Sequence, residues 1–142
     1  MKREEIIAKW AGMTARERDA WVAQAVMGWR RVMRPGGGGG GFVGWQDAEG
    51  RLAAFETDYS LTVDARDCFQ PSTDTHAAWA VFDQHEYVEV ARIPGGTVSY
   101  AVRINGIDGS IRAIIQKPTF PEAICLAALI AKLTEVSANE SA

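Results

Sequence analysis

The chain has few of the side chains that build metal centres or disulfide frameworks. Its 142 residues include two histidines and two cysteines. His76 and His85 are nine residues apart, so a regular helix would place them on opposite sides, where they could not share a metal ion. Cys125 lies in the apolar run Ala123–Ala131 and is typical of a buried, unreactive thiol. We expect reduced thiols, with a disulfide to Cys68 as the alternative, and neither a metal site nor a cofactor.

Neither sign of charge dominates, and no segment is apolar for long. Fifteen basic and eighteen acidic residues give a formal net charge of −3, which argues against broad electrostatic binding to DNA. No run reaches the roughly 18 apolar residues of a membrane-spanning helix. The charged start Met1–Glu5 is not followed by the apolar stretch of a signal peptide. We therefore expect a cytoplasmic protein that does not contact a membrane.

Glycine is concentrated in one run, Gly36–Gly41, which follows Arg34 and Pro35. Glycine loses the most backbone entropy on ordering, so we predict a mobile loop over residues 35–41. The run lacks the Gly-Lys-Ser/Thr ending of a phosphate loop, although a nest of backbone amides for an anion stays an alternative. The length fits a single domain over residues 1–142, with a frayed tail over residues 136–142.

Two helices are predicted near the start of the chain. The first is expected over Lys2–Met13. Thr14 and Glu17 have the spacing of a capping box, in which each side chain bonds the backbone amide of the other residue. The second helix therefore begins after Thr14 and stops near Gly28. Its spacing of apolar residues predicts a buried stripe made of Val22, Val26 and Trp29.

Two further helices are predicted from proline and capping residues. Pro71–Asp74 is a start signal for a helix that ends near His85. Thr119 and Glu122 form a second capping box, which opens the last helix. That helix is apolar on nearly every side over Ala123–Ala131, which is typical of an element buried against a sheet.

Between these helices the pattern favours antiparallel strands. Phe42–Trp45 and Arg51–Thr57 are predicted to form a hairpin. Turn residues separate three further predicted strands: Tyr87–Ile93, Thr97–Ile104 and Ile111–Lys117. A three-residue loop at Pro94–Gly96 is expected to pair Val90 with Tyr100 and Val88 with Val102. Placing Ile104 opposite Ile111 then pairs Val102 with Ala113 and Tyr100 with Ile115, and all these side chains are expected to point to one core. The opposite face would carry charged residues: Glu89, Arg103 and Arg112.

Three segments also carry a resemblance to a known family. They read VAQAVMGW at Val22–Trp29, PSTD-x-x-AAW at Pro71–Trp79 and PEAICLAAL at Pro121–Leu129. In this order they resemble the phage ABA-sandwich domain family. The resemblance implies an α+β fold, with an antiparallel sheet packed by helices in an α/β/α layered sandwich, and an origin in a phage or prophage. It implies no activity.

Arginines are the candidate ligand-binding residues. Guanidinium groups near an indole such as Trp29 or Trp45 suit a ligand that has phosphate and a base. A solvated charge cluster at a helix C-terminus is the alternative for those that follow the second helix. For the arginines of the predicted three-stranded sheet there are three alternatives. They lie on an open face, they pair with carboxylates of the same chain, or they line a ligand or subunit interface. The candidates are Arg30, Arg31, Arg34, Arg103 and Arg112.

These observations predict a non-enzymatic phage or prophage accessory protein of the host cytoplasm that acts by binding. The alternative is a small-molecule binder that sequesters a nucleotide immune signal. No catalytic residue is predicted, and homo-oligomerisation stays open. Four aspartates near the middle of the chain are a further alternative, as a cation site or an acid/base pair, although acidic loops are usually solvated: Asp58, Asp64, Asp67 and Asp74.

Overall fold

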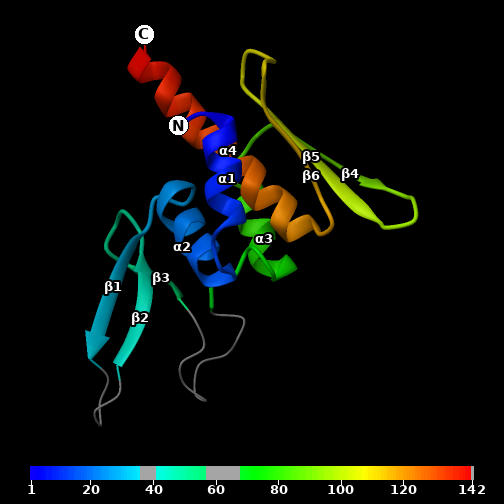
Figure 1. Ribbon diagram of the computed structural model, residues 1–142. Coiled ribbons are helices and arrows are strands. Elements are labelled where there is room, and N and C mark those ends of the chain that lie inside the picture. Colours follow the sequence, from blue (N-terminus) through cyan, green and yellow to red (C-terminus); the bar gives the residue numbers. More distant parts are fainter. Residues whose placement is uncertain (36–40, 57–67, 142) are drawn as a thin grey trace.

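A computed structural model describes residues 1–35, 41–56 and 68–141 (Figure 1). The predicted loop at 35–41 and the aspartates at 58, 64 and 67 lie wholly or mostly outside these residues. The elements in chain order are α1 (Arg3–Ala11), α2 (Ala15–Ala25), β1 (Arg30–Pro35), β2 (Gly41–Gln46), β3 (Leu52–Phe55), α3 (Thr75–Phe82), β4 (Val88–Ile93), β5 (Ser99–Asn105), β6 (Ile111–Lys117) and α4 (Phe120–Ser141).

Helix α2 begins at the predicted capping box and ends earlier than expected. The Glu17 amide donates to Thr14 Oγ1 at 3.2 Å, and the Thr14 amide donates to Glu17 Oε1 at 3.0 Å. The helix stops at Ala25 because Gly28, with φ of +70°, turns the chain out of the helical direction. The prediction that Trp29 belongs to the helical stripe is therefore wrong, since Trp29 lies beyond this turn, directly before β1.

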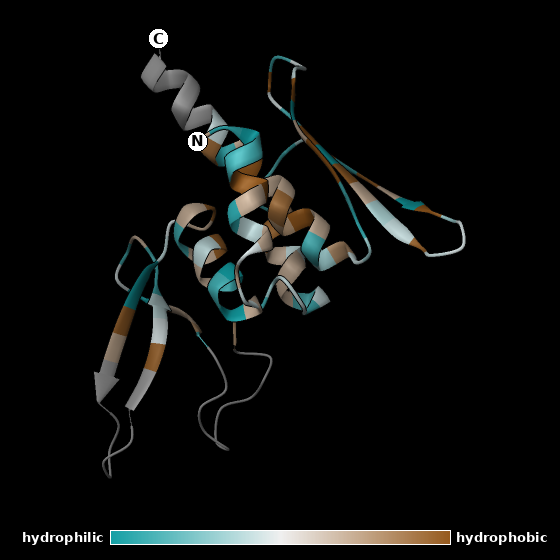
Figure 2. Ribbon diagram, in the orientation of Figure 1, coloured by the Kyte–Doolittle hydropathy of each residue, from teal (hydrophilic) through white to brown (hydrophobic). Residues whose placement is uncertain are grey.

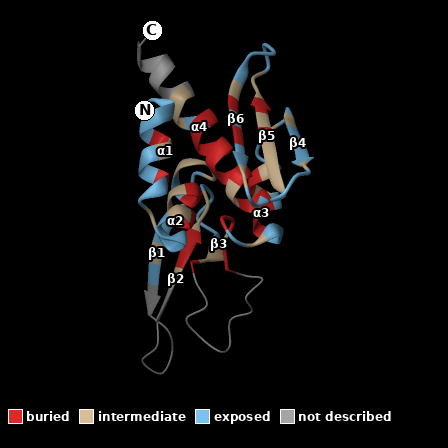
Figure 3. Ribbon diagram, turned by 45° about the vertical axis from the view of Figure 1, so that its right-hand side comes forward, coloured by how far each residue is buried: buried red, intermediate tan, exposed pale blue. Residues whose placement is uncertain are grey.

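Helix α4 is the centre of the core (Figures 2 and 3). Every residue of Ala123–Ala131 is at most 5% exposed, which confirms the predicted burial. The Glu122 amide donates to Thr119 Oγ1 at 3.4 Å, as a capping residue requires. The helix contacts α1, α2, α3, β5 and β6, so its apolar side chains meet a neighbour in every direction.

Helix α3 begins at the predicted signal and is short. Asp74 Oδ2 accepts from the Ala77 amide at 3.1 Å and caps the first turn. The helix ends at Phe82, three residues before the expected end near His85. Its buried residues face α4: Ala77, Ala78 and Val81.

Strands β4, β5 and β6 form one antiparallel sheet in that order, as predicted, but the register differs. The structure pairs Val88 with Ile104, Val90 with Val102, Ile104 with Ala113, and Val102 with Ile115. Each pairing is shifted by two residues from the expected one. The β4–β5 connection spans residues 94–98 rather than three residues. In the β5–β6 pair, Ile111 lies opposite Asn105, and an irregularity between Ile104 and Asn105 shifts the register. A shift of two keeps every side chain on its predicted face. Of the residues expected in the core on the inner face, Val102, Ile104, Ala113 and Ile115 are buried. Val90 and Ile111 were also expected there, but they are 40% and 57% exposed, because Val90 lies on the edge strand and Ile111 at the start of β6.

The smaller sheet, β1–β2–β3, contains the predicted hairpin and one strand that the sequence did not reveal. β2 and β3 pair around a turn in which Asp47 Oδ1 accepts from the amides of Glu49 and Arg51. β1 pairs along β2, with Arg31 opposite Trp45. Trp45 is 1% exposed and belongs to the same core as α4.

The expected α+β class, with antiparallel strands packed by helices, is confirmed. The helices lie between the two sheets in both views (Figures 1 and 3). One face of β4–β6 packs on α4, and the other is open to solvent, where Ile114 is 47% exposed. In the described part of the chain, no helix is long and apolar enough to cross a membrane.

Candidate functional site

The five candidate arginines lie on two different sheets. Arg30, Arg31 and Arg34 belong to β1, whereas Arg103 and Arg112 belong to β5 and β6, on the other side of the helices (Figure 1). The structure therefore does not bring them together as one site. The side chain of Arg34 lies outside the described residues.

The described arginines of β1 have structural partners. Arg30 Nη2 donates to Gln46 Oε1 at 2.7 Å. Arg31 Nε lies 2.7 Å from Glu56 Oε2, and Arg16 Nε of α2 lies 3.2 Å from Glu56 Oε1. Glu56 is 6% exposed, so the two guanidinium groups compensate a carboxylate that would be costly to bury alone. This cluster ties β1 to α2.

Arg103 spans the open face of the larger sheet. Its Nη2 lies 2.5 Å from Glu89 Oε2, and the two residues are register partners. Of the alternatives for this face, the structure shows an open face and an internal pair at the same time. The side chains are 41% and 68% exposed, so the pair stays in contact with water.

Arg112 lies apart from that pair, against the turn that joins β5 to β6. A Cβ atom at Gly106 would come within 2.6 Å of Arg112 Nε, so the absence of a side chain there lets the guanidinium approach the turn. Asp108 in the same turn has a pKa below its usual range, mainly because Ser110 donates two hydrogen bonds to it and to a lesser extent because Arg112 is near. Arg112 makes no hydrogen bond or ion pair with another described residue.

Beside Arg112 is a recess of about 640 Å³, which we name the Arg112 recess. It lies where the α3–β4 connection, the β5–β6 turn and α4 meet. Such a volume is within the usual range for small-molecule sites. Its polar and aromatic lining residues come from these three segments: His85, Glu86, Tyr87, Asn105, Asp108, Arg112 and Lys132.

Two lining groups of the Arg112 recess have unused binding capacity. Asn105 Oδ1 is buried and has no hydrogen-bond partner in the structure, which leaves an acceptor that a ligand could satisfy. Tyr87 is 51% exposed, so it offers aromatic surface that a planar group could contact. Arg112 and Lys132 supply positive charge, and Asp108 and Glu86 balance it. The lining therefore suits a ligand that has both an anionic group and hydrogen-bond donors.

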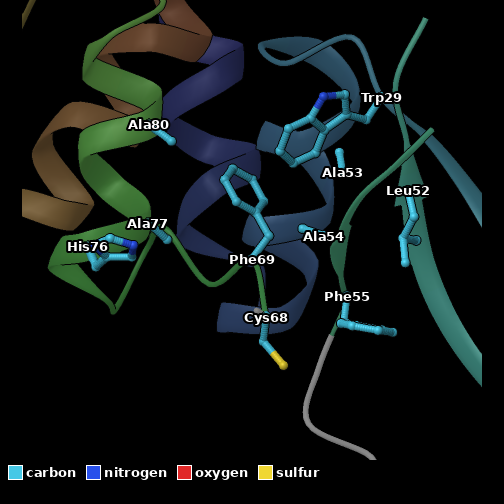
Figure 4. A pocket seen from close by; sticks show the side chains of 10 residues that line it. All are labelled: Trp29, Leu52, Ala53, Ala54, Phe55, Cys68, Phe69, His76, Ala77 and Ala80. Carbon is cyan, nitrogen blue, oxygen red and sulfur yellow. The ribbon is translucent and has the colours of Figure 1, made fainter. Parts of the chain in front are cut away.

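A smaller pocket of about 360 Å³ lies between α3 and β3 (Figure 4). Trp29 and Phe69 meet edge to face across it, with ring centroids 4.8 Å apart. The close-up shows Ala77 and Ala80 on the α3 side and Ala54 on the β3 side. The lining side chains are mostly apolar, and His76, Cys68 and the indole of Trp29 carry the heteroatoms among them.

A comparison with models of protein families identifies the family of the chain. The model described as the phage ABA sandwich domain matches residues 20–129. The chain belongs to this family. No curated protein and no solved structure matches the chain. The family suggests a phage protein.

The histidines and cysteines of this phage ABA sandwich domain lie in separate parts of the structure. His76 lines the pocket of Figure 4 and His85 lines the Arg112 recess, so the two histidines do not meet. Cys68 and Cys125 are buried and not disulfide-bonded. Burial raises the pKa of the Cys125 thiol well above its usual value. Among the described residues, no group of three or more His, Cys, Asp or Glu side chains could hold a metal ion.

One buried acid of the phage ABA sandwich domain was missed by sequence reasoning. Asp19 of α2 is 7% exposed, and its Oδ1 accepts from the Ser72 amide at 2.8 Å. Desolvation raises its pKa to about 6, while the bonds from Ser72 and the charge of Arg18 lower it. The spacing was a usable signal, because Asp19 lies three residues before Val22 on the buried side of the helix. The same bond ties α2 to the residues just before α3.

Proposed function

We propose that this phage ABA sandwich domain is a non-enzymatic accessory protein that acts by binding, and that the Arg112 recess is its binding site. The observation that carries the proposal is the recess itself. It joins a guanidinium without a partner among the described residues, an exposed aromatic ring and an unsatisfied amide oxygen within about 640 Å³.

A binding role is also supported by what the buried ionisable groups do elsewhere. Glu56 is held by Arg16 and Arg31, and Asp19 accepts from Ser72. These contacts hold β1 and the start of α3 against α2, which is a structural use of charge. The Cys125 thiol is kept protonated by burial, and a protonated thiol is a weak nucleophile.

A nucleotide signal of host defence is the second candidate, with sequestration as the role. It is favoured by the placement of Tyr87 with Arg112 and Lys132 in one recess. Base stacking on an aromatic ring and a fork of guanidinium donors to phosphate are the contacts that such a ligand needs. Asn105 Oδ1 would accept a hydrogen bond from an amino group of the base.

The test is to titrate the protein with inorganic phosphate, nucleoside monophosphates and cyclic dinucleotides, and to measure heat of binding and thermal stability. We expect at least one nucleotide to bind and to raise the melting temperature. Arg112→Gln should weaken that binding by about tenfold or more, since a charge-assisted hydrogen bond contributes roughly 1.5–3 kcal/mol. The matched control is Arg103→Gln, which removes an arginine of the same sheet that does not line the recess.

The same titration separates binding from catalysis. After incubation, the protein is denatured and the released ligand is identified by mass spectrometry. A binder returns the nucleotide unchanged, whereas a converted product would refute the non-enzymatic role. Equal loss of binding in the Arg112 and Arg103 variants would refute the assignment of the recess.

A further inference from the structure

β4 is an edge strand whose outer side is open. It hydrogen-bonds only to β5 among the described strands. The Asn105 amide donates to the Tyr87 carbonyl at 2.9 Å, which fixes the alternation of backbone groups along the strand. The backbone N–H and C=O groups of Tyr87, and of every second residue after it, point toward β5. The backbone N–H and C=O groups of the residues between them therefore point to the open side: Val88, Val90 and Arg92.

A groove runs along the inner face of this strand. Val90 and Arg92 are paired with Val102 and Tyr100, so their side chains lie on the sheet face that packs toward the helices. α4 covers β5 and β6 but leaves this margin uncovered, and Val90 is 40% exposed. The resulting groove has a volume of about 610 Å³ and is bounded on its far side by Trp79 and Phe120.

Trp79 is an exposed but well-held anchor. It is 48% exposed, although the residue belongs to α3, whose other face is buried. Its ring lies 4.9 Å from the ring of Phe82 and 5.1 Å from that of Phe120, which fix its position. A rigid, half-exposed tryptophan loses little entropy when a partner covers it, and tryptophan is enriched at binding hot spots.

We propose that the open edge of β4 and this groove bind an extended peptide segment of another protein. The segment adds a fourth strand beside β4 and bonds the outward backbone groups of Val88, Val90 and Arg92. Because strand side chains alternate, every second residue of the peptide points into the groove. A large apolar residue then packs on Trp79, and an acidic residue meets Arg92.

Charge favours this occupant over a second copy of the chain. Arg92 is the charged residue of the groove lining, and it makes no ion pair with another described residue. A two-fold pairing of β4 with its own copy gives Arg92 a carboxylate on the same sheet face only in the register that places Glu86 opposite it, since the registers centred on Val90 or Ala91 place a valine there. That register also places Glu89 opposite itself, and like charges directly opposite destabilise a strand pair. A foreign strand with a carboxylate opposite Arg92 has no such conflict.

The experiment is a selection of random ten-residue peptides displayed on yeast against the intact protein, followed by fluorescence anisotropy on synthetic peptides. We expect an extended consensus with apolar residues at alternate positions and an acidic residue among them. Trp79→Ala should weaken binding on the order of thirtyfold. Arg92→Gln should weaken it several-fold at low salt and less at high salt, because an exposed charge is screened.

Backbone pairing is tested first by changing the peptide and then by changing the protein. N-methylation of the peptide amides that face β4 should weaken binding about tenfold, and methylation of the alternate amides should not. Val90→Pro tests the same contact from the other side, since this residue's N–H makes no bond to β5 and edge strands tolerate proline there. Its melting temperature shows whether the variant is folded.

Three outcomes would overturn the proposal. The first is a selection that yields no shared pattern. The second is equal binding of both methylated forms, which would mean that the peptide does not lie as a strand. The third is a dimer without added peptide on a sizing column that Val90→Pro abolishes, which would assign the edge to a second copy.

Discussion

At the scale of single residues, each buried charged side chain in the described part of the chain has a hydrogen-bonding or ionic partner. Glu56 has two arginines, and Asp19 has the amide of Ser72. The two acids nevertheless differ in kind. The negative charge of Glu56 is balanced by the positive charges of Arg16 and Arg31. The pKa of Asp19 is governed mainly by desolvation, which raises it to about 6. Asp19 therefore links the stability of the fold to pH.

The pH dependence has a definite sign. The pKa of Asp19 is about 6 in the folded state and 3.8 in the reference state, so the folded protein binds this proton more tightly than the unfolded chain. Its contribution to stability is present in full below about pH 4 and is lost as pH rises through about 6. The difference between these two pKa values corresponds to a decrease of roughly 3 kcal/mol in the free energy of unfolding once the pH is well above 6.

Asp19→Asn should remove this dependence. The amide oxygen can still accept from Ser72, and no charge is buried at neutral pH. We expect the variant to exceed wild type by roughly 2–3 kcal/mol above pH 7 and to match it near pH 4. Urea unfolding at several pH values measures the difference. The control is Glu49→Gln, which removes an exposed carboxylate and should leave the pH profile unchanged; a parallel profile for Asp19→Asn would contradict the assignment.

At the scale of elements, α4 organises the core. Its apolar segment is in contact with α1, α2, α3 and the larger sheet, and no side of Ala123–Ala131 is left to solvent. Burial on all sides means that neighbouring side chains cannot close a space left by truncation without moving several elements.

Truncation of this helix should therefore be costly. Leu129 and Ile130 are 0% and 1% exposed, and changing either to Ala should lower the free energy of unfolding by roughly 2–5 kcal/mol. Lys132→Ala on the exposed side of the same helix is the control, with an expected change within about 0.5 kcal/mol. Denaturant midpoints measure both effects. Wild-type midpoints for both core variants would remove α4 from its central role.

At the scale of the whole molecule, the sequence predicted elements better than their assembly. Capping residues such as Thr14, Asp74 and Thr119 fixed helix starts, because they act within one turn. Apolar alternation assigned the sheet faces correctly, yet it is unchanged by a shift of two residues, so it could not determine the register of Val90 or Val102. β1 was missed because its arginines and proline do not have an alternating apolar pattern.

The site was less predictable than the fold for a physical reason. Sequence identifies arginines but not which segments converge in space, so Arg112 was grouped with four arginines that line other surfaces. Tyr87, Asn105 and Lys132 lie near Arg112 only because the α3–β4 connection, the β5–β6 turn and α4 meet at one place. Nothing in their local sequence marks that convergence.

The single domain over residues 1–142 stays a prediction at this scale. Trp45 of the smaller sheet shares a core with α4, so we expect the two sheets to unfold together. Native-state hydrogen exchange in rising denaturant measures this for the amides of β2 and β5 separately. The same opening free energy in both would support one cooperative unit. A lower opening free energy for the amides of β2 would show that the smaller sheet unfolds independently of the larger one.

The late position of α4 in the chain has a consequence for biosynthesis. Translation runs from the N-terminus, so α1, α2, α3, β5 and β6 are made before the helix that they all contact. Until its apolar segment leaves the exit tunnel, the inner face of β4–β6 and the apolar sides of α1 and α2 have nothing to cover them. A nascent or truncated chain that lacks α4 should therefore expose these apolar surfaces and aggregate, which light scattering of a fragment of residues 1–119 would measure.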